Sequence, residues 1–344
     1  MAKSAIAFSP KQFSCWVKAE TNGGTSTQGT SMMQLDVDSV SYPSLNVTQV
    51  LDVRTGSGRV LKDSDFFQDN TQRITELTLS GTMHEDNGGH TLLMQNICND
   101  YTGNPAVAAT YSPPNVQYEN GDGSALANAT AGDTMTIVIA GVDETNHGTG
   151  NVQVSNTKNL VFSGMMCTNF QLSADSGTEG GRLKFSATLQ SGKKPVLNNT
   201  TETGGTYVTT DYKVFSTSSE HLVAGLEVVM NSFTVTIDNP AVFFGSCSNG
   251  YEGATRGAEC AVTFDTQIKY DSVTKDLVHT FDTQSGATAA DLFQFTNDNA
   301  FGIDIDNGIL TNVAYSEGDI MMLDVSGKAT SDGSTVLISF DCNE

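Results

Sequence analysis

The sequence lacks the motifs that mark most enzymes, metal proteins and membrane proteins. It has no G-x-S-x-G motif, no phosphate-binding loop and no C-x-x-C pair, and its six cysteines and five histidines are scattered. The acidic stretches 119–122 and 304–308 do not follow calcium-loop spacing and are expected in turns. No apolar run approaches the ~20 residues that a membrane-spanning helix needs. We therefore expect no enzymatic activity, no metal or other cofactor and no membrane partner.

Positive charge is also scarce. The chain has 17 Lys and Arg residues against 39 Asp and Glu residues, a formal net charge of −22. Proteins that hold nucleic acid need clustered basic residues, so ordinary binding to phosphates is not expected. A surface that DNA touches without being held is compatible with this charge, as are solubility or a salty habitat. Residues 1–8 lack the apolar core of a signal peptide, which predicts a protein made and kept in a cytoplasm.

What is present favours strands and turns. Residues 74–84 alternate, with Leu77 and Leu79 on one side and polar residues on the other, which indicates a half-buried strand. A Gly-rich turn follows, and apolar residues then recur at helical spacing from Leu92 to Ile97. This stretch predicts one strand, one tight turn and one short helix.

The same pattern returns in the second half of the chain. Residues 259–270 alternate as a strand, and Asp271 with Ser272 is placed to cap a short helix through residues 277–281. An offset of 183 residues aligns Glu76 with Glu259. A strand pair around a Gly-rich turn also repeats, from residues 170–189 to residues 309–329, at an offset of 140. We interpret these repeats as an internal duplication.

The repeats divide the chain into two units. We expect an N-terminal arm at residues 1–40, a first unit at 41–192, a linker at 193–221 and a second unit at 222–344. Residues 100–159 look like an insertion that the basic unit does not need. Each unit reads strand, long loop, strand, short helix, connection, strand, Gly-rich turn, strand.

Each unit also has a long loop between its first two strands, at residues 55–72 and 239–258. Loops of this length between paired strands tend to carry function. Adjacent aromatic residues in both suggest docking onto another surface, although packing against their own domain is equally expected. These residues are Phe66, Phe67, Phe243 and Phe244.

Four amphipathic strands and one helix make a small sheet that is covered on one side and polar on the other. Such a sheet has open edges, and joining strands from several copies into a barrel removes them. A barrel with many strands encloses a water-filled lumen that the polar face lines. We therefore expect a mainly β fold with two tandem sandwich-like or half-barrel units, whose strands join neighbouring copies.

The element order resembles that of the major tail tube protein of long-tailed bacteriophages. So does the segment D-V-R-T-G-S-G-R at residues 52–59, followed by T-E-L-T-L-S-G at residues 75–81. The resemblance covers residues ~41–192 and ~222–344. It implies a structural virion protein of the tail, assembled in the host cytoplasm, whose stacked rings form a DNA conduit. Two fused units imply a trimeric, pseudo-hexameric ring, with the long loops joining successive rings.

The resemblance implies partners and site residues. The partners are further copies of the chain, other tail proteins, and viral double-stranded DNA that passes without specific binding. Arg59 and the four loop aromatics are expected between rings. Seven acidic against four basic strand residues predict a mildly negative lumen wall, although they are also expected on any solvated strand face. The expected lumen-facing residues are Asp52, Glu76, Thr78, Ser80, Lys184, Asp238, Glu259, Thr263, Asp265 and Asp324.

Two other functions share this composition. A capsid decoration or tail adaptor protein would not need two copies of the unit. A carbohydrate-binding adhesin module usually exposes aromatic residues on rigid strands, whereas the only tryptophan here, Trp16, lies in a segment without a clear pattern. Both are weaker interpretations than the tail tube subunit.

Overall fold

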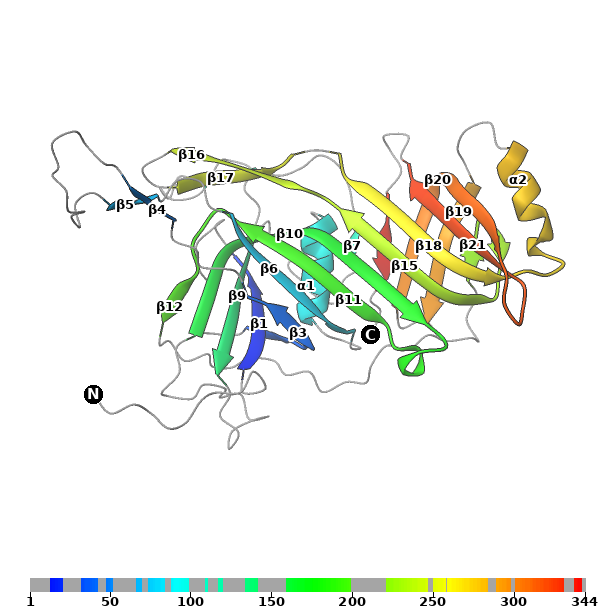
Figure 1. Ribbon diagram of the computed structural model, residues 1–344, viewed down its shortest axis with the longest axis horizontal. Coiled ribbons are helices and arrows are strands. Elements are labelled where there is room, and N and C mark those ends of the chain that lie inside the picture. Colours follow the sequence, from blue (N-terminus) through cyan, green and yellow to red (C-terminus); the bar gives the residue numbers. More distant parts are fainter. Residues whose placement is uncertain are drawn as a thin grey trace.

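The fold is mainly β, as expected, with two short α-helices (Figure 1). The computed structural model describes sixteen segments of the chain. They are residues 13–20, 32–42, 48–51, 66–69, 74–83, 88–98, 109–110, 117–119, 134–141, 159–198, 221–246, 250–257, 259–283, 289–297, 301–330 and 337–341.

One antiparallel sheet of eight strands runs through both halves of the molecule. Residues 13–198 form the first half and residues 221–341 the second. The halves join where Asn169–Asp175 of β10 pairs with Ser232–Asp238 of β15. The order across the sheet is β3 (Ser39–Ser41), β6 (Thr75–Thr82), β11 (Lys184–Ser191), β10 (Asn159–Asp175), β15 (Met230–Asp238), β18 (Ala261–Lys269), β21 (Met322–Ala329) and β20 (Phe301–Ser316).

Each half has one long strand that runs from this sheet into a second layer: β10 in the first half and β20 in the second. The register of β10 shifts between Cys167 and Asn169, and that of β20 shifts between Leu310 and Asn312. Such bulges bend a strand, so the earlier part of each can pair elsewhere. In the first half it pairs with β9 (Met135–Gly141) and β12 (Val196–Asn198), and β9 continues into β1 (Phe13–Ala19) and β2 (Met33–Leu35). In the second half it pairs with β19 (Ala289–Asn297) and β22 (Ser339–Asp341), which continue into β13 (Leu222–Val223), β14 (Leu226–Glu227) and β7 (Ala109–Thr110).

Among the described residues, the strand pairings of one chain do not close into a barrel. Followed from strand to strand, they form an open, branched sheet that never returns to its starting strand. Each half is sandwich-like because its two layers share one bent strand. The tandem duplication and the joining of neighbouring copies remain predictions.

The apolar side of the eight-stranded sheet faces the core. The strands alternate as expected: Leu77, Phe185, Phe170, Phe264 and Leu323 are buried on this side. Helix α1 (Gly88–Cys98) packs in the first half against β10, β1, β2 and β7, and α2 (Leu277–Thr283) packs in the second against β20. Both helices confirm the prediction from sequence.

Each long loop contributes to a hairpin, and both hairpins leave the same rim of the sheet (Figure 1). The first hairpin also takes one strand from the residues just before the expected loop 55–72. The first consists of β4 (Thr48–Leu51) and β5 (Phe66–Asp69). The second consists of β16 (Ala241–Ser246) and β17 (Gly250–Arg256), and β8 (Gln117–Glu119) adds a third strand to it. The opposite rim carries the β20–β21 turn and the β10–β11 turn, which holds the 3₁₀ helix η3 (Glu179–Gly181). The loops are therefore paired strands rather than irregular connections in these parts.

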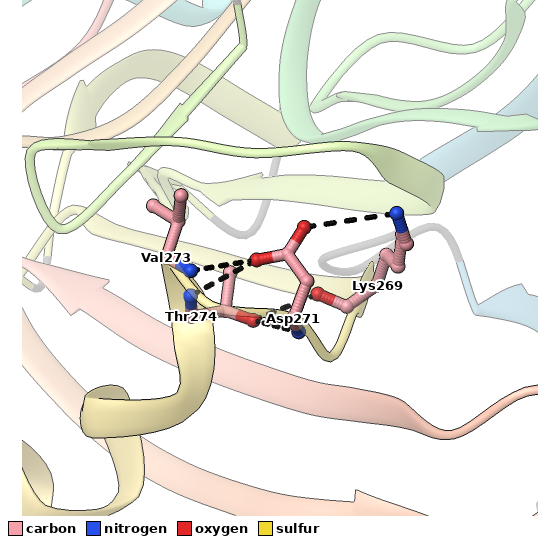
Figure 2. A network of polar contacts seen from close by, with 4 residues as sticks. All are labelled: Lys269, Asp271, Val273 and Thr274. Carbon is pink, nitrogen blue, oxygen red and sulfur yellow. Dashed lines mark hydrogen bonds and ion pairs between the residues drawn. The ribbon is translucent and has the colours of Figure 1, made fainter.

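The second helix begins at a side-chain cap (Figure 2). The Asp271 Oδ1 accepts hydrogen bonds from the backbone N–H groups of Val273 (2.9 Å) and Thr274 (3.3 Å). The Thr274 hydroxyl donates to the Lys269 carbonyl at 2.8 Å. These bonds satisfy donors at the start of η4 (Thr274–Asp276), which leads into α2. The predicted capping role of Asp271 is confirmed.

Several boundaries expected from the sequence differ in the structure. Strands β1 and β2, expected in an N-terminal arm, belong to the first-half core, because apolar residues such as Val17 are buried there. Strand β12, expected in the linker, pairs with β10. Residues 304–308, expected in a turn, lie in β20.

The expected insertion is built into both halves. From residues 100–159, β9 pairs with β1 and β10, β7 pairs with β22, and β8 pairs with β17. Strands β22 and β17 belong to the second half. The described strands of this segment are therefore paired into the fold, and two of them pair with strands of the second half.

Candidate functional surface: the polar face of the sheet

The side of the eight-stranded sheet opposite the core is polar over its whole width. In β6, β11, β15, β18 and β21, alternating residues lie here and most are half-buried by their neighbours or exposed, while the residues between them are buried. The pairing registers align these residues in rows. One row runs Ser80, Ser186, Gln171, Thr236, Thr263 and Lys328, from β6 to β21.

Hydrogen bonds link side chains along and between these rows. The Ser326 hydroxyl donates to Asp265 at 2.6 Å, and the Gln267 amide donates to Asp324 at 2.9 Å. In the first half, the Gln190 amide donates to Glu76 at 2.9 Å. At the junction of the halves, the Gln171 amide donates to the Thr236 hydroxyl at 3.4 Å. The polar face is therefore a continuous, internally bonded surface that crosses from one half to the other.

Most of the predicted lumen-facing residues lie together on this face. Glu76, Thr78 and Ser80 come from β6, Lys184 from β11, Asp238 from β15, Thr263 and Asp265 from β18, and Asp324 from β21. Glu259 lies just before β18, and its carboxylate accepts a hydrogen bond from the Lys328 Nζ at 3.2 Å. Asp52 lies outside the described residues.

Sequence reasoning missed two charged residues on or beside this face. Lys269 occupies the last position of β18 on the polar side, where it is exposed. Asp38 precedes β3 and forms an ion pair with Lys184, with Nζ and Oδ2 3.3 Å apart. Asp38 fell within the expected arm, so no strand pattern placed it here, whereas the alternation of β18 extends to Lys269 and could have identified it.

The charges of this face repel phosphate more than they attract it. Seven acidic and four basic side chains were predicted to face outward. Six of the acidic and three of the basic residues lie in the described part of the chain. The ion pairs Lys184–Asp38 and Lys328–Glu259 are exposed to solvent, so each contributes little stability. Glu76, Asp238 and Asp265 are exposed acids. The resulting excess of negative charge disfavours lasting contact with nucleic acid.

Those predicted loop residues that the structure describes lie on the two hairpins. Phe66 and Phe67 belong to β5, and Phe244 belongs to β16. Phe243 is partly buried and packs against the small cluster of Met166 and Ala254, so it packs against its own chain. Its neighbour Val242 is 51% exposed. Arg59 lies outside the described residues.

Other candidate chemistry finds little support in the described residues. Within them, no group of three or more His, Cys, Asp or Glu side chains is placed to hold a metal ion. Burial raises the pKa of the Cys15 and Cys167 thiols to about 12, so they remain protonated and poorly nucleophilic. Trp16 is fully buried and offers no platform to a sugar. In the described part of the chain, no helix combines the length and apolar character needed to span a membrane.

No protein-family model matches the chain, and no curated protein matches it either.

Proposed function

We propose that this chain is the structural subunit of a bacteriophage tail tube. Copies join edge to edge into a ring, the rings stack, and the polar face lines a conduit through which viral DNA passes. The chain itself, other tail proteins and the passing DNA are its partners, and the virion tail is its location.

The observation that supports this proposal is a sheet that, within the described residues, has one polar face and two free edges. In the described residues, the final stretch of β20, residues 309–316, pairs only with β21. At the other end, β3 pairs only with β6. Free edges of a sheet readily pair with another chain, and a closed ring removes them.

The junction between the halves suggests how copies join. In both halves the sheet order is the first, second, fourth and third strand along the chain: β3–β6–β11–β10 and β15–β18–β21–β20. Strand β10 pairs with β15 within the chain, so β20 of one copy has the matching edge for β3 of the next. Asn169 and Asn312 each follow the bulge of their strand, and Asn169 pairs with Asp238. The offset of 183 residues aligns Thr78, the partner of Ser41, with Ala261, the partner of Asp238. On this alignment Ser41 corresponds to Asp238, and we place Asn312 opposite Ser41 of the next copy.

Simple geometry supports a conduit of suitable width. Three chains of eight strands make a barrel of roughly 24 strands, and strands about 4.8 Å apart with a tilt of about 40° give a backbone diameter of roughly 50 Å. Side chains on both walls narrow this by about 10 Å, which leaves room for a DNA duplex. The acidic wall keeps the duplex from sticking, so it slides.

Engineered disulfides test the ring. We expect Ser41→Cys combined with Asn312→Cys to give covalent dimers and trimers under mild oxidation, with a ladder that stops at the trimer. Paired strands bring Cα atoms to the 4.5–5.5 Å at which disulfides form. Each single variant is the control for the native thiols: Cys15, Cys98 and Cys167 are buried, but Cys260 is only partly buried, so any cross-link through it would also appear in a single variant. Negative-stain microscopy should show rings or tubes with a central hole; monomers at high concentration, or a ladder without an end at three, would contradict the proposal.

A further inference from the structure

A buried arginine at the end of the second hairpin reaches into the first half of the molecule. Arg256 is the last residue of β17 and is only 3% exposed. Its Nη1 donates to the carbonyl oxygens of Cys167 (2.6 Å) and Asn239 (2.8 Å), and its Nη2 donates to the carbonyl oxygen of Asn96 (2.6 Å). These acceptors belong to the bulge of β10, the corner between β15 and β16, and the last turn of α1.

Two buried asparagines complete the cluster. The Asn96 Oδ1 accepts a hydrogen bond from the Cys167 N–H at 2.8 Å and lies 3.4 Å from the Arg256 Nη2. The Asn239 side-chain amide donates to the Ile97 carbonyl at 2.8 Å, and its backbone N–H donates to the Thr168 carbonyl at 2.9 Å. We call Asn96, Asn239 and Arg256 the arginine cluster. It links one helix and three strand segments that lie far apart in sequence.

The arginine cluster supplies a cation and hydrogen-bond donors to the last turn of α1, whose own sequence provides no basic residue there. Carbonyl groups in the last turn of a helix have no partner within the helix, and a cation there is favoured by the helix dipole. Helix α1 has no basic residue in its last turn. Arg256, 160 positions from Asn96, supplies the cation, while Asn239 donates to the next carbonyl. A buried charge is tolerated only when it is hydrogen-bonded, so Arg256 in turn requires α1 and the β10 bulge to be in place.

We propose that Arg256 is a positioning residue that couples the β16–β17 hairpin to α1, so that the hairpin and the last turn of the helix open together. The arginine cluster acts as a latch between the halves. This inference does not rest on the proposed tail tube function, because it concerns contacts within a single chain.

The geometry requires a guanidinium rather than an ammonium group. The two Nη atoms of Arg256 point at acceptors on different elements, and a planar fork reaches both at once. A lysine keeps the charge but brings one nitrogen, which cannot replace contacts to the helix and the bulge together. Arg256→Lys therefore tests the latch without removing the charge.

Hydrogen exchange measured by mass spectrometry on the dispersed single chain tests the coupling. In Arg256→Lys and Arg256→Met, we expect peptides covering residues 88–98 and 241–256 to exchange roughly ten- to a hundredfold faster, and to do so together. Peptides from β18 and β21 should keep their protection. Lys328→Met is the matched control, because it removes one cation from the exposed face.

The outcomes separate the latch from simpler roles. If only residues 241–256 lose protection, Arg256 holds its own hairpin and the coupling is refuted. If all peptides lose protection equally, Arg256 supports global stability and the coupling is again refuted. Should Arg256→Met fail to fold, Asn239→Ser provides the test, since it removes the bond to the Ile97 carbonyl and leaves Arg256 in place. It should accelerate the same two segments to a smaller extent; an effect on neither segment, or on one alone, refutes the latch.

Discussion

The two halves share a strand order but hold their helices differently. In both, a helix follows the second strand of the sheet: α1 follows β6, and α2 follows β18. Helix α1 has 11 residues and is buried along its described positions, whereas α2 has seven residues and exposes His279 and Asp282. The first helix contacts β1, β2, β7 and β10, and the second contacts β20.

The difference shows that two helices at equivalent places in the strand order can be held by different contacts. Helix α1 lies between the polar sheet and the second layer, and its last turn is held by Arg256 from the other half. Helix α2 lies at the margin of the molecule (Figure 1) and begins at a cap made by its own turn (Figure 2). We therefore expect the first helix to be part of the common core and the second to be an added cover.

A second comparison concerns a glycine that faces a phenylalanine in each half. Gly81 on β6 pairs with Phe185 on β11, and Phe264 on β18 pairs with Gly327 on β21. The glycine and the phenylalanine have exchanged strands between the halves. In both, the aromatic ring occupies the space above the glycine, a known way to stabilise glycine within a sheet.

The largest effect should come from truncating the buried helix. Leu93→Ala in α1 removes a fully buried side chain, and we expect it to lower the free energy of unfolding by about 3 kcal/mol. Val278→Ala in α2, at a partly buried position, should cost about 1 kcal/mol. Urea unfolding of the dispersed chain measures both. Equal losses would remove the distinction between a core helix and a covering helix.

The glycine–phenylalanine pair gives a sharper test of how closely the halves correspond. A Cβ at Gly327 would clash with the Phe264 Cε1, so Gly327→Ala must displace the ring. We expect a loss of about 2 kcal/mol, because overpacked cores cost about 1–3 kcal/mol. Phe264→Leu should restore part of this loss when combined with Gly327→Ala. If the double variant loses as much unfolding free energy as the two single variants added together, contact with the ring is not the cause of the loss in Gly327→Ala.

Much of the eight-stranded sheet could be predicted from local pattern. The alternation of β6, β11, β15, β18 and β21 identified their buried and polar faces, because side chains in a strand point to opposite sides in turn. The first helix followed from apolar residues at helical spacing, and the second followed from the capping residues Asp271 and Ser272. These features depend on residues close together in the chain.

Pairing between distant segments could not be predicted in the same way. In the first half, Ser80 pairs with Ser186, and the offsets of 183 and 140 would carry this pair to Thr263 and Ser326 in the second half. The structure instead pairs Ser326 with Asp265, and Thr263 with Lys328. A slip of two residues keeps every side chain on its face, so alternation cannot detect it. The short strands β7 and β8 are paired by long-range packing alone. Arg256 follows a Gly-rich segment that reads as an exposed turn, so nothing local indicated its burial.

A smaller effect should separate the two helices by the way they begin. Asp271→Ala removes the cap before α2 and should cost about 1 kcal/mol of unfolding free energy. Hydrogen bonding from the Val273 backbone, with help from Thr274 and Lys269, lowers the pKa of Asp271. A lowered pKa stabilises the folded state above the unfolded pKa of about 4, and this contribution disappears as the pH falls. Asp271→Asn keeps a capping oxygen and should lose only the pH dependence; a loss equal to that of Asp271→Ala would contradict the cap.

An effect with the opposite pH dependence should come from the second layer of the second half. Burial, together with the charges of Asp306 and Asp291, raises the pKa of Asp304 to about 6. The folded chain therefore holds a proton between about pH 4 and pH 6 that the unfolded chain has lost, so stability falls as the pH rises through this range. Asp304→Asn removes this penalty, and its free energy of unfolding relative to the unaltered chain should rise from pH 4 to pH 7. Asp319→Asn, an exposed acid on the β20–β21 turn, controls for the loss of one carboxylate. If the two variants change alike with pH, the carboxyl of Asp304 carries no penalty from its surroundings.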